Sequence, residues 1–109
     1  MRNVEVYYND IKAGKLTELI INKSYRFEYD GDYLNTSLPP ISLTLPKSQK
    51  TYEGDQLFPA FINLLPEGSN REAICRNFKI DESDFFGLLC RLADGDFIGS
   101  INIRNFKDE

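Results

Sequence analysis

The side chain best placed to do chemistry is Glu67, which lies in the tetrapeptide PEGS between two segments with helical periodicity. A catalytic carboxylate needs a neighbour that sets its pKa or orients a substrate. The nearby candidates are Arg71 and Glu72, and Glu72 already forms a capping box with Ser69. The sequence has no His, the side chain that most often serves as a general acid or base. We therefore interpret Glu67 as a contact residue on a stiff turn and predict no catalytic residue.

Two further features resemble chemical sites only loosely. Residues 95–100, GDFIGS, lack the GxxxxGK[ST] pattern of a phosphate-binding loop and precede a strand rather than a helix. We interpret them as the end of a helix and the entry to a last strand. Cys75 and Cys90 have neither zinc nor redox spacing and are predicted to be small buried thiols. No cofactor or metal site is predicted.

The charge of the chain argues against nucleic-acid binding, because the formal net charge is −4 and the pI about 4.8. Four lysines in predicted turns and loops could form a weak basic patch but are better explained as solvated: Lys12, Lys15, Lys47 and Lys50. Six tyrosines could form a stacking platform on a sheet. In a small barrel they more often belong to the core and rim: Tyr7, Tyr8, Tyr25, Tyr29, Tyr33 and Tyr52.

The first half of the chain has the alternation of strands. Apolar residues alternate over 3–8, 14–21 and 24–29, with turn residues between, which predicts a three-stranded antiparallel meander. A fourth strand is predicted at 41–45, where alternate residues are apolar and prolines flank the segment. The polar residues 47–56 are predicted to form a surface loop.

The second half changes to helical periodicity. Asp55 is predicted to cap a helix over 56–65, and further helices are predicted over 69–78 and 81–92, before a strand at 97–103. The positions of the last helix predicted to face the core are Phe85, Leu88, Leu89 and Leu92.

These patterns predict an α+β fold, in which a small curved antiparallel sheet or partial β-barrel is capped by two or three α-helices. Residues 1–109 are predicted as a single domain, with strands at about 3–45 and 97–103 and helices at about 56–92. No segment has the length and apolarity of a membrane span, and the N-terminus has no signal-peptide pattern. We therefore expect a cytoplasmic protein without membrane contact.

The order of the motifs resembles the N-terminal subdomain of HipA-type serine/threonine kinases, the toxins of bacterial HipBA toxin–antitoxin modules. The matching segments are "VEVYYNDIKAGKLTE", with its turn followed by G-x-L, "ISLTLP", "FPAFINLLPEGSNRE" and "DFFGLLCRLADGDFIGSINI". They span essentially the whole chain. Two positions differ: Ser69 stands where many relatives carry Trp, and Ser100 where Ala is usual. A partner contact made by that Trp in relatives is therefore not carried over.

In full-length kinases of this type the phosphate-binding loop, the catalytic Asp and the metal-binding Asp follow this subdomain. The resemblance therefore implies that this chain is not an enzyme and holds no cofactor, metal or small-molecule substrate. It looks like HipS, the separately encoded subdomain of HipBST-type modules, which binds and restrains the kinase HipT. A HipB-like helix-turn-helix protein is a further partner in a ternary complex.

The resemblance thus implies an antitoxin that docks on a HipT/HipA-like Ser/Thr kinase and does not itself bind nucleic acid. The alternative is a structural scaffold, or an excised HipA subdomain, that mediates contact between the kinase and a HipB-like DNA-binding protein without inhibiting catalysis. The residues expected to meet the partner are Pro66, Glu67, Gly68, Ser69, Asn70 and Arg71.

Overall fold

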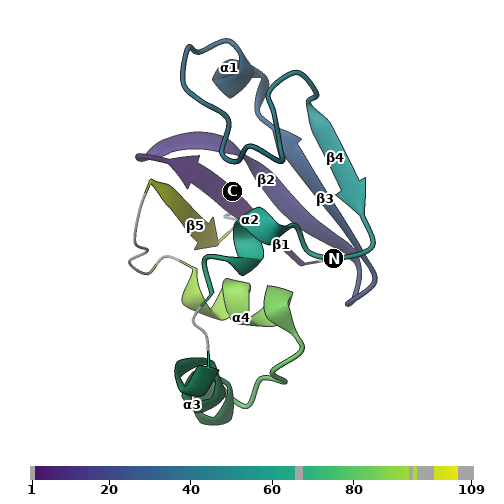
Figure 1. Ribbon diagram of the computed structural model, residues 1–109, viewed down its shortest axis with the longest axis vertical. Coiled ribbons are helices and arrows are strands. Elements are labelled where there is room, and N and C mark those ends of the chain that lie inside the picture. The colour runs from purple at the N-terminus through teal and green to yellow at the C-terminus, as the bar shows by residue number, and fades with distance from the viewer. Residues whose placement is uncertain (1, 66–67, 94, 96–99, 106–109) are drawn as a thin grey trace.

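The computed structural model describes residues 2–65, 68–93, 95 and 100–105. Strands and short helices share this part of the chain, which confirms the predicted α+β class (Figure 1). In chain order the elements are β1 (Arg2–Tyr8), β2 (Ile11–Ile20), β3 (Ser24–Tyr29), α1 (Gly31–Leu34), β4 (Thr51–Gly54), α2 (Pro59–Ile62), α3 (Gly68–Phe78), α4 (Phe85–Leu92) and β5 (Ile101–Asn105).

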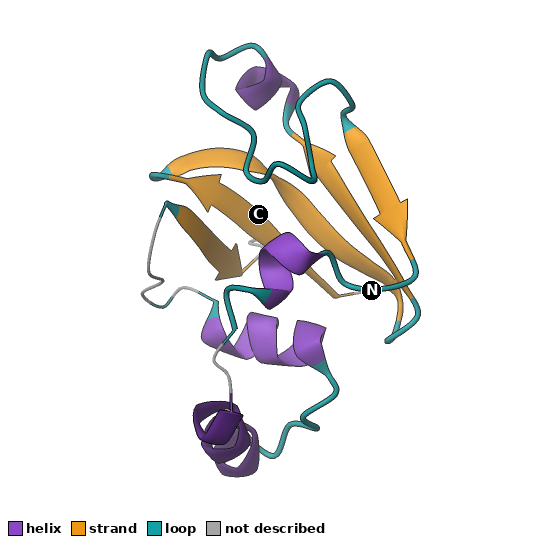
Figure 2. Ribbon diagram, viewed as in Figure 1, coloured by secondary structure: helices purple, strands orange, loops and turns teal. Residues whose placement is uncertain are grey.

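The strands form one open antiparallel sheet in the order β4-β3-β2-β1-β5 (Figure 2). Tight turns join the three N-terminal strands and place Asn9, Asp10 and Asn22 at φ of 46°, 71° and 58°. Asn and Asp tolerate this left-handed conformation better than most residues, and such turns match the twist of the strands they join. The predicted meander is confirmed, and β5 extends it by pairing with β1.

Among the described residues, helices and a loop cover one face of the sheet. The loop between α1 and β4, together with α2 and α4, lies over the covered face (Figure 2). Cross-strand ion pairs join side chains of neighbouring strands, Glu5 with Lys12 at 3.1 Å and Arg26 with Glu53 at 2.8 Å. The fully buried side chains of the sheet include Val4, Val6, Leu16, Phe27, Tyr29 and Ile103.

The tyrosines belong to the core and rim, as predicted. Tyr25, Tyr29 and Tyr33 are buried, and the rings of Tyr29 and Tyr33 stack at 5.9 Å. The others are half-buried: Tyr7, Tyr8 and Tyr52.

The strand predicted at 41–45 is wrong. These residues form turns, and the fourth strand is β4, in the segment predicted to be a surface loop. Prolines on both sides of 41–45 supply no N–H for a ladder. The residues of β4 pair instead with β3, where Glu53 also forms the ion pair with Arg26.

The helix predicted over 56–65 is also wrong in its limits. Pro59 occupies the first position of α2, where its fixed φ suits a helix start, and Phe58 rather than Asp55 is the N-cap residue. Residues 63–65 continue as turns.

The last helix begins later than predicted. Residue Asp81 accepts hydrogen bonds from the backbone and the hydroxyl of Ser83, which form a turn ahead of the helix. Helix α4 therefore starts at Phe85, and Phe86 rather than Phe85 is fully buried. Strand β5 starts at Ile101, whereas the predicted residues 97–99 lie outside the described part of the chain.

Candidate partner-binding site

The segment predicted to meet a partner leads into α3. Pro66 and Glu67 lie outside the described residues, and α3 begins at Gly68. The next two residues, Ser69 and Asn70, are exposed on the first turn of the helix. They are placed to contact another molecule, and their role stays a prediction.

The predicted capping box has the wrong register. A capping box needs its Ser at the N-cap, outside the helix. Ser69 is the second helical residue of α3, because the helix already includes Gly68. The sequence pattern identified the start of the helix to within two residues, which is within the usual uncertainty of a helix boundary.

Two cation–aromatic contacts join α3 to α4. The guanidinium carbon of Arg71 lies 5.3 Å from the centre of the Phe85 ring, and that of Arg91 lies 4.0 Å from the centre of the Phe78 ring. Each helix thus supplies one cation and one ring. The Arg71–Phe85 pair lies at the start of α3, and the Arg91–Phe78 pair lies at its end. Contacts of this kind contribute about 0.5–1 kcal/mol each at exposed sites.

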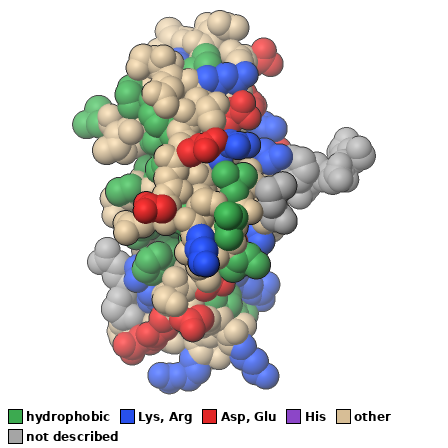
Figure 3. All heavy atoms as spheres, turned by 90° about the vertical axis from the view of Figure 1, so that its right-hand side faces the viewer, with side chains coloured by type: hydrophobic (Ala, Val, Ile, Leu, Met, Phe, Trp, Pro, Cys, Tyr) green, Lys and Arg blue, Asp and Glu red, His purple; other side chains and the backbone are tan. Residues whose placement is uncertain are grey.

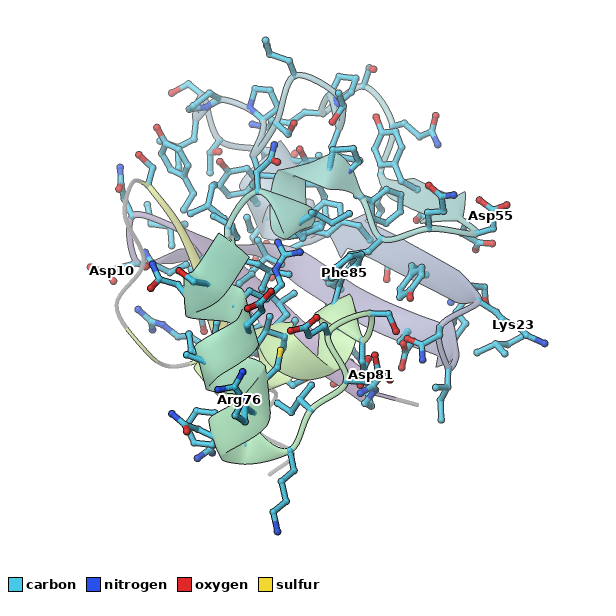
Figure 4. The ribbon with its side chains drawn as sticks, turned by 60° about the horizontal axis from the view of Figure 1, so that its bottom comes forward. Asp10, Lys23, Asp55, Arg76, Asp81 and Phe85 are labelled. Atoms are coloured by element: carbon cyan, nitrogen blue, oxygen red, sulfur yellow. The ribbon has the colours of Figure 1, made fainter. Side chains whose placement is uncertain are left out.

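The side of α3 away from α4 is open to solvent. Helix α3 lies at one end of the molecule, beyond α4 (Figure 1), and Arg76 stands on its surface in Figure 4. The exposed residues of this helix surface are mostly polar: Ser69, Asn70, Glu72, Ala73, Arg76 and Asn77. A partner could therefore reach the start of α3 without displacing another element.

A network of charged side chains holds α4 on the sheet. The guanidinium of Arg2 donates to both carboxylate oxygens of Glu18, at 2.6 and 2.8 Å, and to both of Asp84, at 3.1 and 2.9 Å. Glu18 is 1% exposed and also accepts from the backbone of Asn22 at 3.0 Å. Arg2 lies on β1 and Glu18 on β2, whereas Asp84 directly precedes α4. The network therefore joins two strands of the sheet to the start of α4.

Asp84 also caps α4. Its carboxylate accepts from the backbone N–H of Gly87 at 3.1 Å. A Cβ on Gly87 would lie 2.2 Å from that carboxylate and 2.9 Å from Arg2, so a larger residue there would have to displace these paired side chains. The hydrogen bonds from Arg2, followed by the bond from Gly87, lower the pKa of Asp84 against the effect of burial. The carboxylates in turn raise the pKa of Arg2.

Sequence reasoning did not identify this network. Asp84 had a usable signal, since an Asp directly before an apolar helical run is a preferred N-cap. Arg2 and Glu18 had none, because their spacing of sixteen residues becomes a contact only once the register of β1 and β2 is known. The network fixes the geometry of the fold and offers no open substrate position.

A hollow of about 340 Å³ lies between the β2–β3 turn, the β4–α2 segment and the start of α4. Figure 4 labels Asp55 and Phe85, which both line it. The other described residues that line it carry amides, hydroxyls and apolar side chains. Among the described residues, Asp55 therefore supplies the only carboxylate of the hollow, and no Lys or Arg lines it. The arrangement suits an uncharged or cationic group, without the paired groups needed for acid–base chemistry.

The described residues show no group of three or more His, Cys, Asp or Glu that could hold a metal ion. Both cysteines are free thiols; Cys75 is buried as predicted, and Cys90 is half-buried. Burial raises the pKa of Cys90 to about 11. None of the described helices has the length and apolar character to cross a bilayer.

Comparison with known proteins identifies the family of this fold. Residues 4–104 match the HipA N-terminal domain family. The chain belongs to this family. An uncharacterized protein of Haemophilus influenzae is 33% identical over 86 residues, which span 79% of this chain and 77% of that protein.

Two solved structures share the fold of the HipA N-terminal domain described above. A structure described as the N-terminal domain of HipA toxin superimposes with a TM-score of 0.73 at 28% identity, covering 100% of this chain and 96% of that one. The HipA of Shewanella oneidensis MR-1, in a complex with HipB and operator DNA, gives 0.70 at 20% identity. That match covers 96% of this chain but 24% of the HipA chain, so it shows the fold alone. The family is named after this N-terminal domain of HipA, a toxin of toxin–antitoxin systems.

Proposed function

We propose that this chain is a non-catalytic, HipS-like subunit that binds a HipA-type Ser/Thr kinase on a separate polypeptide and restrains it. The observation that carries the proposal is the match of residues 4–104 to the HipA N-terminal domain family. In the Shewanella structure a chain of this fold is matched over 24% of its length, so the fold occurs there beside a larger remainder. That the domain and the kinase are separate polypeptides is part of the proposal, and the proposed partner is a kinase that lacks this domain.

The geometry of α3 supports contact through its first turn. Cation–aromatic pairs hold α3 on α4, and the charged network holds α4 on the sheet. A surface that is fixed before binding loses little conformational entropy on association. The proposed contact segment is the one predicted from the sequence, residues 66–71.

The test mixes the purified chain with the HipA-type kinase encoded in the same genome. We expect co-purification and a loss of kinase autophosphorylation. Asn70→Lys places a large cation on the first turn of α3 and should weaken binding, whereas the same change at Asn77, exposed near the end of α3, is the control. Glu67→Gln tests the acidic residue of the segment. Absence of both binding and inhibition with the wild-type chain would refute the proposal.

A structural scaffold is the second candidate function. It is favoured by the Shewanella structure, in which HipA is in a complex with HipB and operator DNA. In this role the chain would join a kinase to a HipB-like DNA-binding protein. It would bind the kinase without changing autophosphorylation, so the same kinase assay separates the two roles.

A further inference from the structure

The loop between α1 and β4 carries an unusually exposed apolar side chain. Leu43 is 95% exposed, and the next most exposed large apolar side chain among the described residues is Ile21 at 67%. Residues 33–46 include no Asp, Glu, Lys or Arg, although these types make up 28% of the chain. Depletion of charge distinguishes the centres of protein interfaces from other protein surface.

Single exposed apolar residues are common on proteins and need a second observation before they indicate an interface. Two of the four other exposed large apolar side chains among the described residues have charged neighbours in the sequence or in space. Ile11 lies between Asp10 and Lys12, and the ring of Phe78 is covered by Arg91. Leu43 has no such neighbour in the sequence.

The second observation is the rigidity of the turn that presents Leu43. The turn is closed by a hydrogen bond from the N–H of Leu45 to the carbonyl of Ser42, at 3.1 Å. The hydroxyl of Ser42 accepts from the N–H of Thr44 at 3.2 Å. Leu43 thus occupies the corner of a hydrogen-bonded turn, where its side chain points away from the protein.

A buried tyrosine clamps both sides of this turn. The hydroxyl of Tyr29 accepts from the N–H of Ile41 at 3.2 Å and donates to the carbonyl of Leu45. Ile41 and Leu45 are themselves buried, so they hold the turn down on each side of Leu43. The hydroxyl of Tyr33 donates to the carbonyl of Pro39 at 2.6 Å and fixes the approach to the turn.

The loop is raised from the covered face of the sheet, in front of the strands and above α2 (Figure 1). Figure 3 shows hydrophobic side chains projecting from the molecule at the height of this loop. The loop is thus accessible to a second protein while its backbone is fixed.

We propose that Leu43 is an anchor that enters an apolar pocket on the kinase-bearing part of a HipA-type protein. This inference rests on the proposed function and names a second contact surface for it. The occupant follows from the coverage of the Shewanella HipA, in which this fold is 24% of a chain and shares its polypeptide with the remaining 76%. We therefore expect the uncharged, fixed surface around Leu43 to bind the kinase part that makes up this larger remainder. Anchor residues of interfaces are typically apolar groups presented by rigid backbone.

The test measures binding of Leu43→Ser to the HipA-type kinase of the same genome, produced without its own copy of this domain. We expect the Kd to rise about tenfold or more, since burying a Leu side chain contributes at least that factor. Ile21→Ser is the matched control and should leave the Kd unchanged. Neither variant should change the melting temperature, because both side chains are largely exposed. Leu43→Met should retain binding, since Met is apolar and of similar volume.

The outcomes separate this inference from the proposed function. If the wild-type chain does not bind the kinase, the proposed function fails and the anchor fails with it. If the wild-type chain binds and Leu43→Ser binds equally well, only the anchor is refuted. Equal weakening by Ile21→Ser, or a change in the self-association of the isolated chain with unaltered kinase binding, would also refute it.

Discussion

Replacing Arg2 by Met tests the network that joins α4 to the sheet. Met keeps an apolar stem of similar length but removes the guanidinium. The variant leaves Glu18, whose side chain is 0% exposed, with the backbone N–H of Asn22 as its remaining hydrogen-bond donor among the described residues. It also removes the two hydrogen bonds that Asp84 receives.

The cost of this change follows from the burial of the partner left behind. Removing one member of a buried ion pair typically costs 3–5 kcal/mol, because the remaining charge loses its compensation. A third of the Arg2 side chain is exposed, so water can reach part of the site, and we expect the lower end, about 3 kcal/mol. For a domain of this size the melting temperature should fall by roughly 12 °C.

Urea unfolding followed by circular dichroism measures the effect, with Arg26→Met as the matched control. Arg26 also lies on a strand and pairs with a carboxylate, Glu53, but both side chains are largely exposed and the loss should be below about 1 kcal/mol. The double variant Arg2→Met/Glu18→Met should be less destabilised than the sum of the single variants, by about 1–2 kcal/mol. Equal losses for Arg2 and Arg26, or strict additivity in the double variant, would refute the assigned role of the network.

Three further changes test single positions. The pKa of Asp84 is lowered by its hydrogen bonds from Arg2. Its contribution to stability is therefore present above the unfolded-state pKa near 4 and is lost as the pH falls through the folded-state pKa. Asp84→Asn, which still caps a helix, should reduce the loss of unfolding free energy that unfolding curves show between about pH 2 and 5. Gly14→Ala should destabilise the fold by about 1–3 kcal/mol, since its Cβ would lie 2.3 Å from the carbonyl of Glu28, and an unchanged melting temperature would contradict this. Cys90, with its pKa raised to about 11, should react with a thiol reagent at pH 8 roughly a hundredfold more slowly in the folded than in the urea-unfolded chain.

The N-terminal meander could be predicted from the sequence because each strand has its own alternation and each turn its own Asn or Asp. The segment 41–45 shows the limit of that signal. Its alternation is real, since Ile41 and Leu45 are buried and Leu43 is exposed on the other side. Over a few residues, a turn can alternate buried and exposed side chains in the same way as a strand. The hydroxyl that stabilises this turn belongs to Tyr29, twelve residues before Ile41 in the sequence, so the local pattern could not reveal it.

The start of α3 was predicted to within two residues from its local pattern. The groups that hold α3 in place could not be predicted in the same way. Arg71 meets Phe85, and Arg2 meets Asp84, across 14 and 82 residues of sequence. Such pairs depend on how helices pack, which periodicity does not specify.

The two proposed contact surfaces are attached to the sheet by different means, and this separation has a measurable consequence. The first turn of α3 depends on α4 and hence on Arg2, whereas the turn with Leu43 depends on Tyr29 of β3. Changes at sites with no shared partner are usually additive in free energy. Leu43→Ser combined with Asn70→Lys should therefore raise the Kd for the kinase by the product of the two single factors, whereas Arg2→Met should weaken the α3 contact and leave the factor for Leu43→Ser unchanged. A double variant that binds no worse than either single variant would mean that one contact forms only through the other, and the two surfaces would then have to be described as one.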